Sequence, residues 1–263
     1  MSTRRDPRTV ILATITGILL IAAAVAALLI AVVTLFQTRR LYAQYCTSGA
    51  RAVLRIWGIR VRVHGRPQDG ARQVVYLSNH SSTIDLFLLV ALGLPNTRFF
   101  MSGFLRKKLP LGILAYLMGT FFTVPQNQPD ARRRIFARAC RTLAATRECV
   151  YLSPEGTRVA SGQIGHFNKG TVHLATALGA PLAPFHIFIP REIDPGMGYR
   201  AKPGTVVVTF KPLIETHDWR VEDVVANTEY VRDLFVTWHR ELWHEYSNSA
   251  GVAPARQVAH ARA

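Results

Sequence analysis

VVYLSNHSSTIDLFLLVALG, residues 74–93, joins two apolar runs through a polar break. The break lies at residues 78–80, and the chain becomes apolar again from Ile84. The first run predicts a buried strand, and the second predicts a helix that ends at Gly93, because glycine adopts the conformation that closes helices. Loops that follow buried strands hold functional side chains in α/β proteins, so this segment also predicts a site.

Two interpretations of this loop remain open from the segment alone. If His80 lies on the loop and Asp85 lies in the first helical turn, the carboxylate can accept a hydrogen bond from the imidazole. It would then fix the tautomer and stabilise the protonated ring, as the partner of a general base does. Alternatively, Ser82 and Asp85 form an S-x-x-D capping box, which requires no catalysis.

The alternation of strand and helix continues along the chain. Further strands are predicted at IRVRVHG, RFFMS, CVYLSPEG, APLAPFHIFIP and TVVVTFKPLI. Periodic segments predict helices at DARRRIFARACRTLAAT, at KGTVHLATALG and between residues 218 and 249. We therefore predict an α/β fold with a largely parallel central sheet flanked by helices over residues 60–249, and a disordered Ala/Arg-rich tail over residues 250–263.

A second polar cluster follows the predicted strand at residues 149–152. Gly156 lets a ligand approach the backbone closely, and Arg158 offers a planar fork suited to phosphate. Lys169 opens the next helix, where backbone amides favour anions. The alternative is a turn rich in proline and glycine whose charges are merely solvated.

The N-terminal region carries a long apolar segment. Residues 1–8 are basic, and residues 9–37 contain no charged side chain, which is long enough for a transmembrane or membrane-embedded helix. Residues 38–59 predict a basic amphipathic linker helix, lying on the membrane surface or packed on the core. Arginines are more numerous after the apolar segment than before it, so we expect the globular part in the cytoplasm. A helical hairpin that enters one leaflet is the alternative.

Composition narrows the class of protein. The chain of 263 residues has 32 basic and 16 acidic side chains, a net charge of +16. Such a charge attracts nucleic acid, anionic lipid or phosphorylated substrates without choosing among them, and no nucleic-acid-recognition motif is present. Three cysteines, an odd number without a C-x-x-C pair, argue against a disulfide framework or a zinc ribbon, and no metal-ligand motif occurs.

The two polar clusters, about 75 residues apart in this order, resemble the motifs of the glycerolipid acyltransferase family. Asn79, His80 and Asp85 fit its N-H-x-x-x-x-D block, and residues 154–158 fit its P-E-G-T-R block. The F-x-K-G sequence follows at residues 167–170, and a proline-bearing apolar block lies at residues 180–184. The resemblance covers roughly residues 60–215, and it identifies residues 60–249 as an acyltransferase domain.

The resemblance implies an enzyme that moves a fatty acyl group from acyl-CoA or acyl carrier protein to the hydroxyl of lysophosphatidic acid, giving phosphatidic acid in phospholipid biosynthesis. His80 would be the general base and Asp85 its partner, with oxyanion donors among the backbone amides near His80 or Gly156. The expected substrate-binding residues are Asn79, Glu155, Gly156, Thr157, Arg158 and Lys169. No metal or cofactor is expected. The alternatives are acylation of another lysolipid, for example lyso-ornithine lipid, and a non-catalytic, membrane-anchored lipid-binding protein.

One block departs from the family pattern. The family has G-x-x-F followed by an arginine near the phosphate of the acceptor, whereas residues 119–124 lead here to Pro125. Phosphate recognition would then rest on Arg158 and Lys169, or on residues 132–134, unless the acceptor carries another head group. We expect the chain at the cell inner (cytoplasmic) membrane, with its catalytic domain on the cytoplasmic side. An anionic membrane surface is an expected partner, and nucleic acid is not.

Overall fold

The computed structural model describes residues 6–159, 163–196 and 200–250, so the predicted tail lies almost entirely outside the described residues. The strands are β1 (Ile59–His64), β2 (Val75–Leu77), β3 (Thr97–Ser102), β4 (Phe121–Thr123), β5 (Cys149–Leu152), β6 (Leu182–Phe188) and β7 (Gly204–Phe210). The helices are α1 (Pro7–Val33), α2 (Arg39–Ile56), α3 (Asp85–Leu92), α4 (Gly103–Arg106), α5 (Leu111–Leu117), α6 (Pro129–Thr146), α7 (Gly170–Leu178) and α8 (Val224–Ala250).

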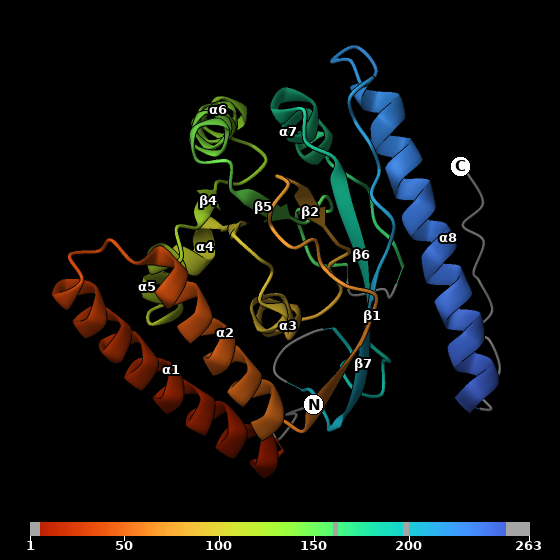
Figure 1. Cartoon of the computed structure of the whole chain (residues 1–263). Helices are drawn as coiled ribbons and strands as arrows, with labels where there is room; N and C mark the ends of the chain where they lie inside the picture. The colour runs from red at the N-terminus through yellow and green to blue at the C-terminus, as the bar shows by residue number, and fades with distance from the viewer. Residues whose placement is uncertain (1–5, 160–162, 197–199, 251–263) are drawn as a thin grey trace.

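The strands form one sheet in the order β1-β7-β6-β2-β5-β3-β4. Neighbouring strands are parallel except for β6 and β7, which are antiparallel. The predicted fold class, a largely parallel sheet flanked by helices, is therefore confirmed (Figure 1). Parallel strands buried on both faces are expected to be apolar throughout, and all residues of β2, β5 and β6 are buried.

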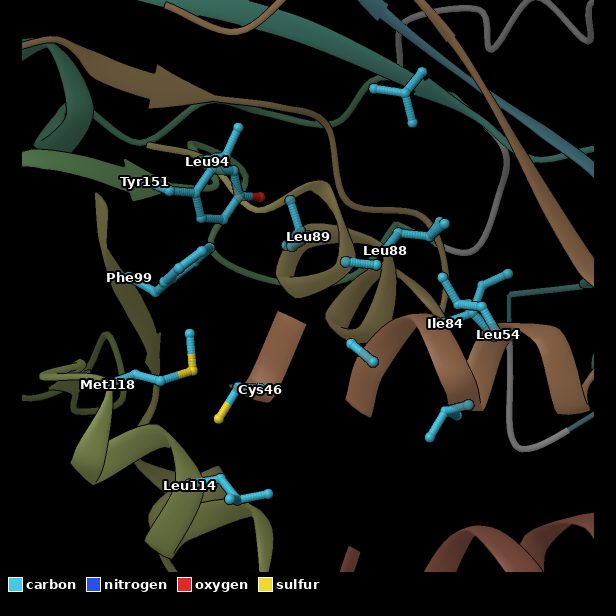
Figure 2. Close-up of a cluster of buried hydrophobic side chains, with 14 of the residues drawn as sticks. Cys46, Leu54, Ile84, Leu88, Leu89, Leu94, Phe99, Leu114, Met118 and Tyr151 are labelled. Carbon is cyan, nitrogen blue, oxygen red and sulfur yellow. The ribbon is translucent and has the colours of Figure 1, made fainter. Parts of the chain in front are cut away.

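Alternate residues of the central strands point into two separate cores. Tyr76 and Tyr151 belong to the core on the side of α1, α2, α3 and α5, where Figure 2 shows Tyr151 beside Phe99. Their neighbours Val75 and Val150 belong to the core on the side of α6, α7 and α8. This alternation follows from the two-residue period of a strand, and it leaves the ends of β2 and β5 free to carry the loops of the site.

The structure corrects the predicted N-terminal boundaries. α1 ends at Val33 rather than at residue 37, and Leu35 and Phe36 have positive φ angles in the turn that leads to α2. α2 is not a mere linker, because it packs against α3 and buries five side chains: Tyr42, Cys46, Ala50, Val53 and Leu54. Of the two locations considered for this helix, the structure shows packing on the core.

α1 packs against α2 and α5 through one face. Its small residues Ala24, Ala27 and Ala31 are buried, and the Trp57 indole N–H donates to the Thr16 hydroxyl at 2.9 Å. The remaining face exposes large apolar side chains: Val10, Ile11, Ile15, Ile18, Leu19, Ile21, Val25, Leu28, Leu29, Val32 and Val33. Within the described residues, α1 is the helix long and apolar enough to cross a membrane, a property that some core helices and signal sequences share.

Candidate active site

The two polar loops predicted to carry the site lie side by side. β2 and β5 are parallel neighbours in the sheet, so the loops that follow them begin at the same edge. The amide of Val159 donates to the carbonyl of His80 at 2.8 Å, which joins the two loops directly. The structure thus brings together the two clusters that lie about 75 residues apart in the sequence.

His80 and Asp85 form the pair at the centre of this site. The Nδ1 atom of His80 lies 2.8 Å from Oδ2 of Asp85, whose side chain is 0% exposed, whereas the imidazole is 32% exposed. The same carboxylate oxygen accepts from the amides of Ser81 at 2.8 Å and Ser82 at 2.9 Å. The two interpretations of the sequence are therefore compatible, since one carboxylate both holds the loop that enters α3 and orients the ring.

Glu155 ties the second loop to the first. Its Oε2 accepts from the amide of His80 at 2.6 Å, and its Oε1 accepts from the amide of Gly165 at 2.7 Å. Burial raises the pKa of the Glu155 carboxyl to about 7, although these two amides and the nearby imidazole act in the opposite direction. Both oxygens of this predicted substrate-binding residue thus bind the backbone, and one of them positions His80.

Asn79 is also placed inside the protein. Its side chain is buried, donates to the carbonyl of Ile187 at 2.9 Å and accepts from the amide of the same residue at 2.8 Å. Ile187 belongs to β6, so Asn79 continues the pairing between β2 and β6 beyond the end of β2. The geometry assigns Asn79 to the support of the loop that carries His80.

A cavity of about 680 Å³ opens beside His80. Its walls are largely apolar and come from α1, α2, α3, α4, α5, β3 and α6, and include Leu20, Leu54, Phe87, Met101, Leu105 and Phe136. A second apolar cavity of about 460 Å³ lies between α1, α2 and α5. The two cavities share wall residues, among them Leu20, Phe87 and Met101, so they are neighbours.

Three cationic side chains, Lys108, Arg132 and Arg158, line the larger cavity, and no described residue in its lining is acidic. Arg158 donates to the hydroxyl of Thr83 and, at 3.2 Å, to the carbonyl of Gly196. Arg132 donates to the carbonyl of Val124 at 3.1 Å. The guanidinium of Arg132 therefore reaches the backbone immediately before Pro125.

The remaining predicted site residues occupy different environments. Gly156 lines the cavity with a φ of +67°, and a Cβ atom there would lie 2.9 Å from the side-chain nitrogen of Asn168. Thr157 and Lys169 are exposed, and neither belongs to the cavity lining, so their predicted role in substrate binding stays a prediction. Glycine is required at position 156 by this conformation and by the close approach of Asn168.

The backbone amides expected to stabilise an oxyanion are already engaged. The amide of His80 donates to Glu155, and those of Ser81 and Ser82 donate to Asp85. The amide of Gly156 donates to the carbonyl of Ser153 at 3.2 Å. These groups hold the loops in shape, so the oxyanion would need another donor or a change in the loop.

Asp194 is a residue of the site that sequence reasoning missed. It is buried, its Oδ2 accepts from the hydroxyl of Ser82, and its Oδ1 accepts from the amide of Gly196 at 2.8 Å. The carbonyl of Gly196 in turn binds Arg158. Asp194 thus connects the His80 loop with the cationic wall of the cavity. It follows β6 in a loop without a motif, and only its acidic character could have drawn attention to it.

The structure gives no sign of a metal centre or a disulfide in the part that it describes. All three cysteines, Cys46, Cys140 and Cys149, are free. No group of three His, Cys, Asp or Glu side chains among residues 6–159, 163–196 and 200–250 is arranged to hold a metal ion. The expectation that the chain needs no cofactor stays a prediction.

The segment that carries both polar loops matches a known protein family. A family model described as Acyltransferase matches residues 60–188, a range that contains both polar loops. Residues 60–188 form an acyltransferase-family domain. The resemblance found in the sequence motifs is therefore confirmed, and the paired His80 and Asp85 lie within this acyltransferase domain.

Curated relatives carry a consistent name. Proteins named 1-acyl-sn-glycerol-3-phosphate acyltransferase include one from Limnanthes douglasii, 28% identical over 188 residues, and the alpha form from Bos taurus, 27% identical over 192 residues. The alignments cover 70% and 71% of this chain and 65% of each relative. The chain thus spans slightly less than two thirds of the length of these relatives.

A solved structure shares the fold beyond the acyltransferase domain. The 1-acyl-sn-glycerophosphate (LPA) acyltransferase PlsC from Thermotoga maritima matches with a TM-score of 0.72 and 20% identity. The match covers 89% of this chain and 94% of that chain, so it extends beyond the acyltransferase domain. At this identity the likeness establishes a common fold.

Proposed function

We propose that this chain transfers a fatty acyl group from a thioester donor to the free hydroxyl of lysophosphatidic acid, giving phosphatidic acid in phospholipid biosynthesis. The observation that carries the proposal is the pairing of His80 with a fully buried Asp85 at the edge of an apolar cavity. The names of the relatives support the choice of lysophosphatidic acid as the acceptor.

The paired side chains supply general base catalysis. Nδ1 of His80 donates to Asp85, which leaves Nε2 to take the proton from the acceptor hydroxyl as its oxygen attacks the thioester carbonyl. The tetrahedral intermediate then expels the thiolate, which receives the proton from the imidazolium. Asp85 stabilises the protonated ring between these two transfers, and general base catalysis contributes roughly 10²–10⁴-fold.

The cationic wall of the cavity would bind the phosphate of the acceptor. Arg132 and Arg158 line the cavity that contains His80, and both present guanidinium groups suited to phosphate. Arg132 contacts Val124, beside the proline that departs from the family pattern. We infer that Arg132 replaces the missing arginine, with Lys108 as a further cation, and that the exposed Lys169 has no part in binding.

The apolar walls would hold the acyl chains. The larger cavity continues toward the second one past Phe87 and Met101, which line both. An acyl chain whose carbonyl lies beside His80 could therefore extend along α1 and α2, where burial of each methylene contributes about 0.8 kcal/mol. This arrangement explains why the cavity combines three cations with a largely apolar lining.

The exposed apolar face of α1 would lie in the membrane. Thr16 and Gly17 of α1 line the same cavity as His80, so the helix lies along the acyltransferase domain and does not extend away from it. We infer that α1 enters the leaflet that contains the lipid substrate, beside the basic surface of the domain. The inner membrane, with the domain on its cytoplasmic side, remains our proposal from the distribution of arginines.

Replacing the base tests the reaction. His80→Ala should abolish acyl transfer from acyl-CoA or acyl carrier protein to lysophosphatidic acid while the protein still binds lipid vesicles. Unchanged turnover would exclude the mechanism. Absence of turnover in the unmodified chain, together with vesicle binding, would instead favour a non-catalytic lipid-binding protein.

Acylation of another lysolipid is the second candidate, because Pro125 stands where the family has a phosphate-binding arginine. Membranes incubated with a labelled acyl donor and a panel of acceptors, including lyso-ornithine lipid, distinguish the two. We expect lysophosphatidic acid to be the preferred acceptor. Indifference to lysophosphatidic acid, with turnover of another lysolipid, would replace the first candidate by the second.

A further inference from the structure

The outer surface of α6 carries a dense row of arginines. Five exposed arginines lie on this helix and its C-terminal cap, and we call them the arginine face: Arg133, Arg134, Arg138, Arg141 and Arg147. The acidic residue exposed on the same helix is Asp130, which pairs with Arg133 at 3.6 Å. Most of the positive charge therefore lacks an acidic partner on its own helix.

The arginine face is not built to lie in a bilayer. The apolar residues of α6 point inward, where Ala139 and Leu143 are fully buried and Ile135 and Phe136 pack against the same core. No large apolar residue of α6 is exposed, in contrast to the long apolar face of α1. A helix that binds a membrane surface presents large apolar side chains beside its cations, and the exposed uncharged residues here are small.

The arginine face lies next to the reaction cavity. α6 also carries Arg132 and Phe136, which line the cavity that contains His80. The exposed arginines from Arg134 to Arg147 extend over about 20 Å along the helix. Figure 1 shows α6 on the opposite side of α4 and α5 from α1, so a partner could reach it from the water while α1 occupies the membrane.

We propose that the arginine face of α6 docks an acidic acyl carrier protein that delivers the acyl thioester to His80. This inference rests on the proposed acyl transfer and selects one of its two donors. The phosphates of coenzyme A are concentrated at one end of a small molecule, whereas a row of arginines about 20 Å long matches the acidic surface of a protein. Complementary charge over such a length accelerates association and orients the partner toward the cavity.

The test reverses two charges in the middle of the arginine face. The full chain carrying Arg138→Glu and Arg141→Glu is compared with a matched control, Arg62→Glu and Arg66→Glu, at the opposite edge of the sheet. Arg62 lies on β1 and Arg66 follows it, and both are exposed, while α6 contacts β4 at the other edge. Each protein is assayed with acyl carrier protein and with acyl-CoA as donor, at low and high salt.

We expect the α6 variant to lose at least about tenfold in kcat/KM with the carrier donor at low salt, with a smaller loss at high salt. Its kcat/KM with acyl-CoA should change less than twofold, and the control variant should change less than twofold with both donors. Equal losses with both donors, or no loss with the carrier, would overturn the inference. A matching loss of binding to anionic vesicles would assign the arginine face to the membrane.

Direct binding separates this inference from the proposed reaction. The carrier protein alone, without an acyl group, should bind the unmodified chain and the control variant, and bind the α6 variant at least about tenfold more weakly. If no donor supports turnover but the carrier still binds in this manner, the reaction fails and the docking surface stands. If the charge reversal disturbs folding, the comparison is repeated with the milder double variant Arg138→Ala and Arg141→Ala. Alanine favours the helical conformation, so this variant should keep α6 intact.

Discussion

Two parts of the site are held together by different kinds of contact. We call His80, Asp85 and Glu155 the corner, and the apolar side chains that line the cavity the wall. In the corner, Asp85 and Glu155 each hold backbone amides at distances of 2.6–2.9 Å, so every group has a fixed direction. The wall consists of side chains such as Leu54 and Phe87, whose contacts are apolar and have no preferred direction. The reaction therefore depends on a few hydrogen bonds of defined geometry, whereas binding of the acyl chain depends on the volume of the cavity.

Removing the charge of Asp85 tests the corner most severely. In Asp85→Asn, the amide nitrogen can face Nδ1 of His80, which would place the ring proton on Nε2 and remove the base. We expect kcat to fall on the order of 10³–10⁴-fold, the loss that follows when a catalytic histidine is held in the wrong tautomer. The measurement is the steady-state rate with saturating lysophosphatidic acid and donor.

The same variant needs a check on folding, because Asp85 also binds the amides of Ser81 and Ser82. Oδ2 makes all three of these contacts, so an amide nitrogen that faces Nδ1 leaves both serine amides without this acceptor, and the free energy of unfolding should fall by about 1–3 kcal/mol for each amide. A variant that keeps more than a tenth of the rate while remaining folded would show that the carboxylate serves only to hold the loop.

Glu155→Gln tests the connection between the two loops. The two oxygens of Glu155 bind different amides, so one of them must face an N–H donor when it is replaced by an amide nitrogen. A buried donor left unpaired costs about 1–3 kcal/mol, and we expect kcat to fall roughly 10–100-fold through displacement of His80. Glu222→Gln, at an exposed position, is the control and should leave the rate unchanged.

The same variant should change how stability depends on pH. Burial raises the pKa of Glu155 from 4.5 to about 7, so the folded state keeps a proton between these values that the unfolded state has lost. This group therefore makes the free energy of unfolding fall as the pH rises through that window. Urea unfolding between pH 4.5 and 8 should show a shallower decrease in Glu155→Gln; an unchanged slope would contradict the burial of this proton.

Arg132→Ala tests the boundary between the corner and the wall. Loss of a guanidinium that binds phosphate should raise the KM for lysophosphatidic acid on the order of tenfold with little change in kcat, because the binding is made before the reaction. Arg133→Ala is the matched control, since this neighbour is exposed and pairs with Asp130. An equal effect of both variants would mean that general charge, and not a phosphate contact, raises the affinity.

The sequence predicted the corner better than the wall for a physical reason. Strand ends are marked by abrupt changes from apolar to polar residues, so the loops of His80 and Glu155 could be located and expected to meet. The inward direction of Asn79 and Glu155 was not visible, because substrate contacts and loop support use the same polar residue types. Asp194 lies in a loop without a motif, and only the fold brings it to Ser82.

The wall could not be predicted because α1 is apolar on all sides. Its composition indicated a membrane segment but gave no sign of which face packs on the domain, and the buried face proved to consist of the small residues Ala24, Ala27 and Ala31. The packing of α2 on α3 was one of two alternatives, because the apolar face of an amphipathic helix can bind either a membrane surface or a protein core. Apolar contacts without a preferred direction are therefore harder to predict from a sequence than a polar motif is.

Phe87→Ala tests the wall alone, with the smallest expected effect. The Phe87 ring lies between the two apolar cavities, because it lines both, so its removal should join them into a longer channel. The longer channel should accommodate longer acyl chains. For each additional methylene of the donor that it buries, kcat/KM for the longer donor should rise about fourfold relative to the shorter one, which corresponds to about 0.8 kcal/mol. The rate with the best donor should remain within about tenfold, since no hydrogen bond of the corner changes.

Leu88→Ala provides the contrast on the same helix, because Leu88 is fully buried and lines neither cavity. It should lower the free energy of unfolding by about 2–5 kcal/mol without changing chain-length preference. A change of preference in Leu88→Ala as large as that in Phe87→Ala would mean that loosening of α3, and not the volume beside Phe87, selects the donor. The wall would then share the fixed geometry of the corner, and the contrast between the two would disappear.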